Sequence, residues 1–273
     1  MGDLWLRADT ETGALSAELT EFHCVNGGRG FGGWTAALAA LAAARSAGDR
    51  QLHTCQVMFT RPALPGELTL SVTELVAGRT AAAYQVTMSQ DERPVLAAQC
   101  WFTDASLLAA VGPVSRRIAE VPPPGACPRV TWIEQEFPCL GGFTERAVEF
   151  PLSAEEFDTT FRDGGDRLTV WMAPAQTTEP AADAGLAERL TDLMMFDCHL
   201  MDAALRGGPG VTMVSLDLTA TWHTTARRPS LTLFDARGRT DGLLAATYAS
   251  LIAPDGTVRA TGTSQCRVYP RQT

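Results

Sequence analysis

The chain has 273 residues, a hydrophobic fraction of 45% and a net charge of −9, which is enough for one large domain or two small ones with sizeable cores. A nucleic-acid-binding protein neutralises phosphates with basic residues, and 31 acidic against 22 basic residues argue against that class. Every basic residue is an arginine, so a lysine Schiff base and a P-loop lysine are both excluded.

The seven cysteines are odd in number and form no C-x-x-C pair, which argues against a disulfide framework and against a zinc site. The first residues are acidic instead of basic and apolar, so no signal peptide is expected. The longest run of small apolar residues, 34–44, is too short to span a bilayer. We therefore expect a cytoplasmic protein with reduced thiols, and no metal, cofactor, nucleic acid or membrane partner.

The first half begins with a glycine-rich segment at 28–33. Alanine and leucine favour a helix over residues 34–47, and Gly48 is a typical helix stop. Alternating apolar residues between turn residues then predict a run of strands. These are expected at 52–59, 67–75, 81–88 and 95–102.

Five prolines lie between Gly112 and Arg129. Proline lacks a backbone donor and fixes φ, so neither a helix nor a central strand is expected there. We interpret this stretch as a linker. The predicted organisation is an N-terminal unit at 1–111, a linker at 112–129 and a C-terminal unit at 130–273.

The second half repeats the order of the first. Strands are expected at 147–150 and 168–172, then a helix at 184–206 that ends at the glycines of 207–210. Further strands are expected at 212–222, 230–234, 243–252 and 258–268. The last strands of the halves match in Ala97-Ala98-Gln99-Cys100 and Thr263-Ser264-Gln265-Cys266. One helix against an antiparallel sheet, twice over, predicts an α+β architecture.

Residues 28–33 spell G-x-G-x-x-G. A dinucleotide site would need this motif to open a βαβ unit, whereas a run of hairpin-like strands follows the helix. We interpret the segment as a loop whose backbone approaches a ligand. The N–H groups at the start of the helix would then face a developing negative charge.

Neither a G-x-S-x-G elbow nor an H-E-x-x-H motif occurs, so serine-hydrolase and zinc-peptidase chemistry have no support. The four histidines are scattered, and only His199 lies near an acid on the second helix. That helix carries Asp192, Asp197 and Asp202 among apolar residues. Successive acids are five residues apart, which rotates each by about 140° around the helix axis relative to the one before it. They therefore cannot all point inward.

Several short stretches occur in a fixed order along the chain: residues 31–33, 59–62, 190–192, 214–217, 222–223 and 262–265. Together they resemble the acyl-CoA thioesterase II (TesB-like) family. The resemblance implies a double hotdog fold, in which two fused units each have a long helix wrapped by a curved antiparallel sheet. It also implies a thioesterase that acts on acyl-CoA or on acyl groups bound to a carrier protein.

The family's catalytic Asp, Ser or Thr, and Gln fall on Asp192, Ser215 and Gln265, with Asp197 as the alternative acid. The resemblance implies that the acid activates a water molecule that the other two orient. Substrate would contact the backbone at Gly32 and Gly33, and the arginine after the first helix, Arg61, would meet the CoA phosphates. The family also forms assemblies, so a homo-oligomer is left open.

Two alternatives stay open at this point. One is a hotdog hydratase or dehydratase acting on enoyl or hydroxyacyl thioesters, for which His199 would serve as the base. The other is a non-catalytic protein that binds acyl thioesters in a biosynthetic pathway.

Overall fold

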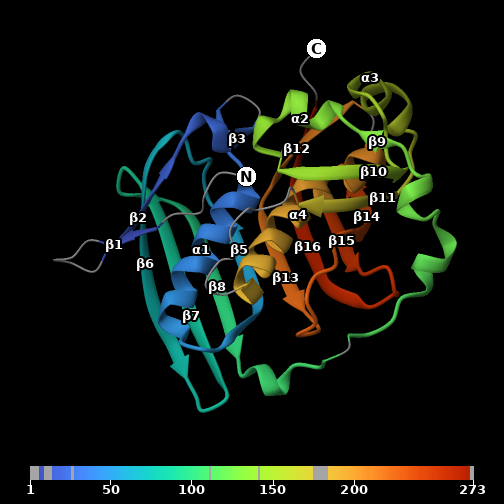
Figure 1. Cartoon of the computed structure of the whole chain (residues 1–273). Helices are drawn as coiled ribbons and strands as arrows, with labels where there is room; N and C mark the ends of the chain where they lie inside the picture. The colour runs from blue at the N-terminus through green and yellow to red at the C-terminus, as the bar shows by residue number, and fades with distance from the viewer. Residues whose placement is uncertain are drawn as a thin grey trace.

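Two long helices lie side by side at the centre of the computed structural model, α1 (Gly32–Ala47) and α4 (Ala184–Arg206) (Figure 1). The sheet wraps around both. The described residues are 6–8, 14–25, 28–110, 112–140, 142–174, 184–208 and 210–270. The start of α4 confirms the predicted helix, whereas α1 begins two residues earlier than predicted and includes Gly32 and Gly33.

The strands form one antiparallel sheet that both halves share, in the order β1-β2-β6-β7-β8-β5-β13-β16-β15-β14-β11-β10-β9, with β12 also paired to β16. The first half supplies β1 (Arg7–Ala8), β2 (Leu15–Leu19), β5 (Gln51–Phe59), β6 (Gly66–Ala77), β7 (Ala81–Gln90) and β8 (Arg93–Thr103). The second half supplies β9 (Arg129–Val130), β10 (Phe143–Glu149), β11 (Arg167–Pro174), β12 (Val211–Ser215), β13 (Asp217–Trp222), β14 (Thr232–Asp241), β15 (Leu244–Ile252) and β16 (Val258–Pro270). A separate two-stranded ribbon pairs β3 (Cys24–Val25) with β4 (Arg29–Gly30).

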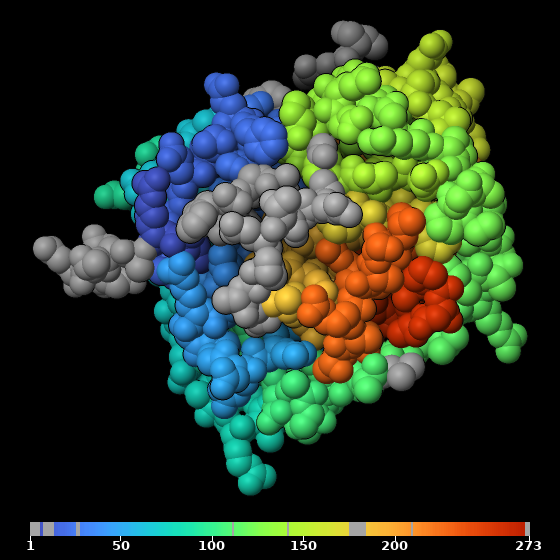
Figure 2. Space-filling model, in the orientation of Figure 1, coloured from blue at the N-terminus to red at the C-terminus, as the bar shows by residue number. Residues whose placement is uncertain are grey.

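The two halves are copies of one unit. In each, the strand after the long helix pairs with the last strand of the unit, β5 with β8 and β13 with β16. The repeat extends to single residues, because Cys55 lies opposite Cys100 and Ser215 lies opposite Cys266. The units meet where β5 pairs with β13, and Figure 2 shows them side by side, with the first in blue and teal. The predicted α+β double hotdog is confirmed.

Small residues let the helices approach their surroundings closely. Most of the alanines of α1 are fully buried, including Ala36, Ala39 and Ala43. A Cβ at Gly262 on β16 would lie 2.5 Å from the ring of Phe196 on α4. The alanine-rich sequence that predicted a helix is therefore also the sequence that close packing requires.

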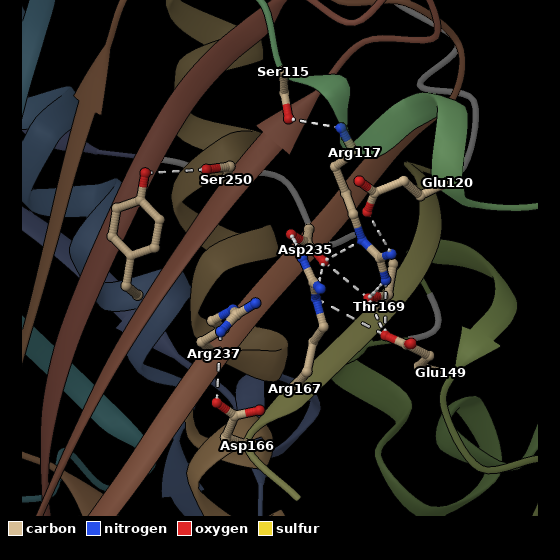
Figure 3. A network of polar contacts seen from close by, with 11 residues as sticks. Ser115, Arg117, Glu120, Glu149, Asp166, Arg167, Thr169, Asp235, Arg237 and Ser250 are labelled. Carbon is tan, nitrogen blue, oxygen red and sulfur yellow. Dashed lines mark hydrogen bonds and ion pairs between the residues drawn. The ribbon is translucent and has the colours of Figure 1, made fainter.

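The chain between the two units crosses the outer face of the second unit's part of the sheet. It runs through η2 (Ala105–Leu107), η3 (Arg116–Glu120) and η4 (Pro124–Ala126). Arg117 of η3 donates hydrogen bonds to Asp235, Glu149 and Thr169 (Figure 3). The indole N–H of Trp171 donates to the carbonyl of Pro122. The crossing segment is thus fixed to the second unit, and the predicted limits of units and linker stay a prediction.

The remaining elements are short: η1 (Glu21–His23), α2 (Trp132–Glu136), η5 (Pro138–Leu140), α3 (Ala154–Glu156) and η6 (Phe157–Phe161). Within the described ranges, no helix is both long enough and apolar enough to cross a membrane. All seven cysteines are free thiols.

Candidate functional site

Asp197 of α4 lies against the N-terminus of α1. Its Oδ2 accepts a hydrogen bond of 2.7 Å from the backbone N–H of Gly33, the second residue of α1. The first N–H groups of a helix have no partner inside the helix and attract negative charge. The N–H of Gly32 has no hydrogen-bond partner within the described residues. One donor at this helix start therefore holds the acid, and its neighbour is available to a ligand.

Glycine is required at both positions by the close approach of α4. A Cβ at Gly33 would lie 2.8 Å from the Cα of Met194 and 3.0 Å from the Cβ of Asp197. A Cβ at Gly32 would lie 2.8 Å from Oδ2 of Asp197 and 3.1 Å from Cζ of Phe59. The glycines predicted to contact substrate thus also create the space in which the acid sits.

The surroundings of Asp197 favour its protonated form. Burial raises its pKa, the Gly33 N–H lowers it, and the charge of Asp202 raises it, with a result of about 6. The carboxyl is only partly buried. It is therefore an acid that is ionised at neutral pH and yet keeps an affinity for protons, which suits a general base.

Ser215 and Cys266 lie on the strands that face this acid. The Cys266 thiol contacts the Ser215 hydroxyl and is close enough to Asp197 to respond to its charge. Burial raises the pKa of Cys266 to about 11 and that of Cys139, on η5, also to about 11. Both thiols are neutral at pH 7, so neither is a thiolate nucleophile there.

An irregularity in the strands places Ser215. The predicted strand 212–222 is divided at Leu216, whose N–H donates to the carbonyl of Gln265 and whose carbonyl accepts from the N–H of Phe59. The N–H of Gln265 donates to Oδ1 of Asp217 instead of to a backbone carbonyl. The side chain of Asp217 thereby holds the sheet together at the interruption between β12 and β13.

Gln265 does not point towards Asp197. It is exposed, whereas its neighbours Ser264 and Cys266 are 4% and 0% exposed and face the helices. Because side chains alternate between the faces of a strand, Gln265 lies on the outer face of the sheet. The water-orienting role that the resemblance implied for Gln265 has no counterpart in this geometry.

Asp192 lies in a different part of the core. It is 0% exposed, and its Oδ2 accepts hydrogen bonds from Trp222 Nε1 at 2.9 Å and Arg259 Nε at 3.1 Å. Arg228 lies 3.8 Å from its Oδ1. Arg259 is seven residues from Cys266 along β16, a distance of roughly 23 Å in a strand. The structure therefore brings Ser215 near Asp197, the alternative acid, and leaves Asp192 in a buried ion cluster.

The positions of Asp192 and Asp197 around α4 explain why the sequence leaves two candidates for the catalytic acid. Asp197 is on the face that meets α1, three residues after Met194, whose Cα approaches Gly33. Asp192 is on the face that meets β13 and β16. The signal that separates them is the set Leu190, Met194 and Asp197, spaced by four and three residues on one helix face.

His199 is not available as a base. Its Nε2 lies 2.9 Å from Oε1 of Glu145 and its Nδ1 lies 3.0 Å from Oδ2 of Asp202, and the side chain is 1% exposed. Both ring nitrogens are therefore occupied by carboxylates. The hydratase alternative, which gave His199 that role, is not supported by this arrangement.

Arg61 is exposed, and its Nη1 donates to the carbonyl of Pro94 at 3.0 Å. Its contact with CoA phosphates stays a prediction. In the part of the chain that the structure describes, no three His, Cys, Asp or Glu side chains are arranged to hold a metal ion.

The first unit has lost the equivalent site. Cys55 and Cys100 occupy the places of Ser215 and Cys266, with their sulfurs 3.7 Å apart and both residues 0% exposed. The facing helix α1 carries no acidic residue. The pair of units therefore holds one candidate site, made from the N-terminus of α1 and the acid of α4.

A known protein family matches the first half of the chain in sequence. Residues 22–103 match the family described as "Acyl-CoA thioesterase N-terminal domain". The matched segment is less than half of the chain. It contains both Gly32 and Gly33, and so the TesB-like resemblance is confirmed in the half that supplies the helix N-terminus.

The solved structures extend the match in fold to the whole chain. The tesB protein of Mycobacterium avium subspecies paratuberculosis has a TM-score of 0.78 at 19% identity, with 98% of this chain and 97% of that chain covered. The acyl-CoA thioesterase II TesB2 of Mycobacterium marinum has a TM-score of 0.74 at 17% identity, with coverage of 98% and 97%. A bifunctional dehydratase-cyclase domain of ambruticin biosynthesis has a TM-score of 0.55 at 18% identity, with coverage of 96% and 94%. No curated protein sequence matches the chain significantly.

A methyl group at Gly32 should disable the site. The Cβ of a Gly32→Ala variant would displace the Asp197 carboxylate, and a misplacement of about 1 Å can cost about 100-fold in rate. We expect a loss of that order in thioester hydrolysis. Gly125→Ala is the matched control, because a Cβ there meets nothing within 4 Å; equal losses in both variants would contradict the assignment.

Proposed function

We propose that the chain is a thioester hydrolase for acyl-CoA, or for acyl groups on a carrier protein, and that Asp197 is its general base. The single observation that carries the proposal is the hydrogen bond between Asp197 and Gly33 at the start of α1. It combines a proton acceptor with a helix N-terminus in one place. The family match of residues 22–103 supports thioester chemistry at this position.

The reaction follows from these groups. Asp197 takes a proton from a water molecule, whose oxygen attacks the thioester carbon. The carbonyl oxygen becomes an oxyanion that the N–H of Gly32 stabilises, a contribution of about 3–4 kcal/mol per donor in comparable sites. The C–S bond then breaks, and the leaving thiolate takes the proton from Asp197. The products are a free acid and a thiol, and no covalent acyl-enzyme forms.

In this proposal, Ser215 orients the water. Its hydroxyl both donates and accepts hydrogen bonds, and it lies beside Cys266 near Asp197. The site requires no cofactor in this mechanism. The cytoplasmic location and the assembly of several copies stay predictions.

The reaction can be tested by mass spectrometry of free acids. The protein would be incubated with acyl-CoAs of short, long and aromatic acyl groups, and with enoyl-CoA as a contrast. We expect release of free acid and CoA from at least one class. Addition of water to enoyl-CoA without release of CoA would instead indicate a hydratase, and binding without any reaction would indicate an acyl-thioester binding protein.

The pH dependence should show the raised pKa of Asp197. Its carboxylate is the active form, so kcat/KM should fall as the pH is lowered through about 6. An ordinary exposed aspartate would place this limb near pH 4. Rates measured from pH 4 to 9 with a neutral acyl group would decide between the two, and an acidic limb near 4 would contradict the assignment.

A further inference from the structure

A cluster of three charged side chains lies on the side of α4 opposite the candidate site. It takes no part in the mechanism above. His199 of α4 is held between Glu145 of β10 and Asp202 of α4, at 2.9 and 3.0 Å. His199 and Glu145 are 1% and 3% exposed. The rings of Phe150 and Phe234 pack against the imidazole, with centroids at 4.8 and 5.9 Å.

The contacts define the protonation of the cluster. Burial by itself would lower the pKa of His199, but the charges of Glu145 and Asp202 and the hydrogen bonds to both raise it to about 10. The ring is therefore an imidazolium that donates from both nitrogens. Oε2 of Glu145 has no hydrogen-bond partner among the described residues.

Stability alone does not explain such a cluster. Buried ion clusters contribute little compared with apolar residues of the same volume, and apolar side chains surround this one. Its position suggests another role. Asp197 and His199 are two residues apart, so they project from nearly opposite sides of α4. His199 faces β10, and Asp197 faces α1.

This arrangement connects the cluster to the acid mechanically. A rotation of α4 by about 20° would move a carboxylate that lies about 6 Å from the helix axis by about 2 Å. That movement would break the hydrogen bond to Gly33. The bonds from His199 to Glu145 oppose such a rotation from the far side of the helix.

We propose that Glu145, His199 and Asp202 form a positioning group that fixes the rotation of α4 and so holds Asp197 on the N–H of Gly33. The proposal rests on the proposed function of Asp197. It assigns the cluster no contact with substrate. Its acid partner on α4, Asp202, also adds negative charge on the side of Asp197 away from α1.

Among the charged groups around Asp197, Asp202 is the one that raises its pKa. From α1 comes the N–H of Gly33, and from η5 and β16 come the thiols of Cys139 and Cys266. Cys198, next to Asp197 on α4, has a pKa raised well above its usual value by burial and then by Glu145 and Asp197. The three thiols are neutral, so removal of the Asp202 charge should lower the pKa of Asp197.

The experiment compares two asparagine variants, Asp202→Asn and Asp192→Asn, in the full chain. Both remove a carboxylate from α4 five residues from Asp197, but only Asp202 belongs to the positioning group. The acidic limb of kcat/KM should move to lower pH in Asp202→Asn and stay in place in Asp192→Asn. An unshifted limb together with an unchanged kcat in Asp202→Asn, with a lowered melting temperature, would show a merely structural role and overturn the proposal.

His199→Gln supplies the mechanical test. We expect kcat to fall about tenfold or more with little change in KM, since the acid is displaced while the substrate contacts remain. An unchanged kcat in a folded His199→Gln protein would also overturn the proposal.

A direct titration separates this inference from the proposed function. The carboxyl carbon of Asp197 can be followed by 13C NMR in the wild type and in His199→Gln, with Asp197→Asn used to assign the signal. The N–H of Gly33 lowers the pKa of Asp197, so loss of this hydrogen bond through rotation of α4 should raise the titration midpoint in His199→Gln, which would support the positioning group even if no thioester is hydrolysed. An equal midpoint in a folded His199→Gln protein contradicts it even if hydrolysis is fast.

Discussion

Replacement of Asp197 by asparagine should abolish most of the hydrolytic activity. The amide keeps the size of the side chain but cannot take a proton from water, and loss of a general base costs roughly 10²–10⁴-fold in rate. We therefore expect kcat to fall by about 1,000-fold in Asp197→Asn. Release of free acid, measured by mass spectrometry, avoids thiol dyes that would react with the seven cysteines.

The same variant should not be less stable than the wild type at pH 8. The folded-state pKa of Asp197, about 6, is above its ordinary value. Its contribution to stability is therefore present at low pH and is lost as the pH rises through about 6. Asparagine removes the cost of the buried charge at pH 8. A large fall in melting temperature would mean that the lost activity reflects misfolding.

Truncation of Asp192 should lower stability, in contrast to Asp197→Asn. In Asp192→Ala, Arg259 and Arg228 lose the fully buried carboxylate of Asp192. Removal of one member of a buried ion cluster costs about 3–5 kcal/mol. We expect the free energy of unfolding in urea to fall by about that amount. The exposed Asp241→Ala is the control and should change stability by about 0.5 kcal/mol or less.

A comparison of hydrolysis in these variants separates the two acids. If Asp192 were the base, its asparagine variant would lose activity at a pH where the protein is still folded. The structure gives it instead three contacts inside the core, with Trp222, Arg259 and Arg228. Asp192→Asn should therefore keep its turnover at temperatures well below its melting point.

The sequence predicted the fold well because its signals are local. Alternating apolar residues and turn residues define most strands, and the linker is marked by its prolines. The main errors are at β14 and β10. β14 continues to Asp241, beyond the predicted end at 234, because Arg237 and Arg239 point outward while Gly238 packs against Ala204. The missed part of the strand is hidden in the sequence because its inner face carries only the small residues Ala236 and Gly238, between outward-facing arginines.

The site was harder to predict than the fold. Gly32, Gly33 and Ser215 lie near one acid, Asp197, and their roles stay predictions. The choice between Asp192 and Asp197 depends on the rotation of α4, which a spacing of five residues does not determine. The outward direction of Gln265 depends on the register of β16, where a shift of one residue reverses the face of every side chain. Neither quantity is contained in a short motif.

The same reasoning applies to His199, which the sequence offered as a base only for the hydratase alternative. A histidine beside an acid on a helix is a reasonable base candidate. The second carboxylate, from Glu145, comes from a strand 54 residues earlier. Only the folded chain shows that both ring nitrogens contact carboxylates and that the charge of Asp202 raises the pKa of Asp197.

A crystal structure with a non-hydrolysable acyl-CoA analogue, in which an amide replaces the thioester, tests the central claim most directly. The account predicts the amide oxygen within hydrogen-bond distance of the Gly32 N–H. It also predicts a water molecule on the Asp197 carboxylate, facing the carbonyl carbon. An analogue bound with its carbonyl at the Asp192 cluster, or on the outer face of the sheet beside Gln265, would contradict it.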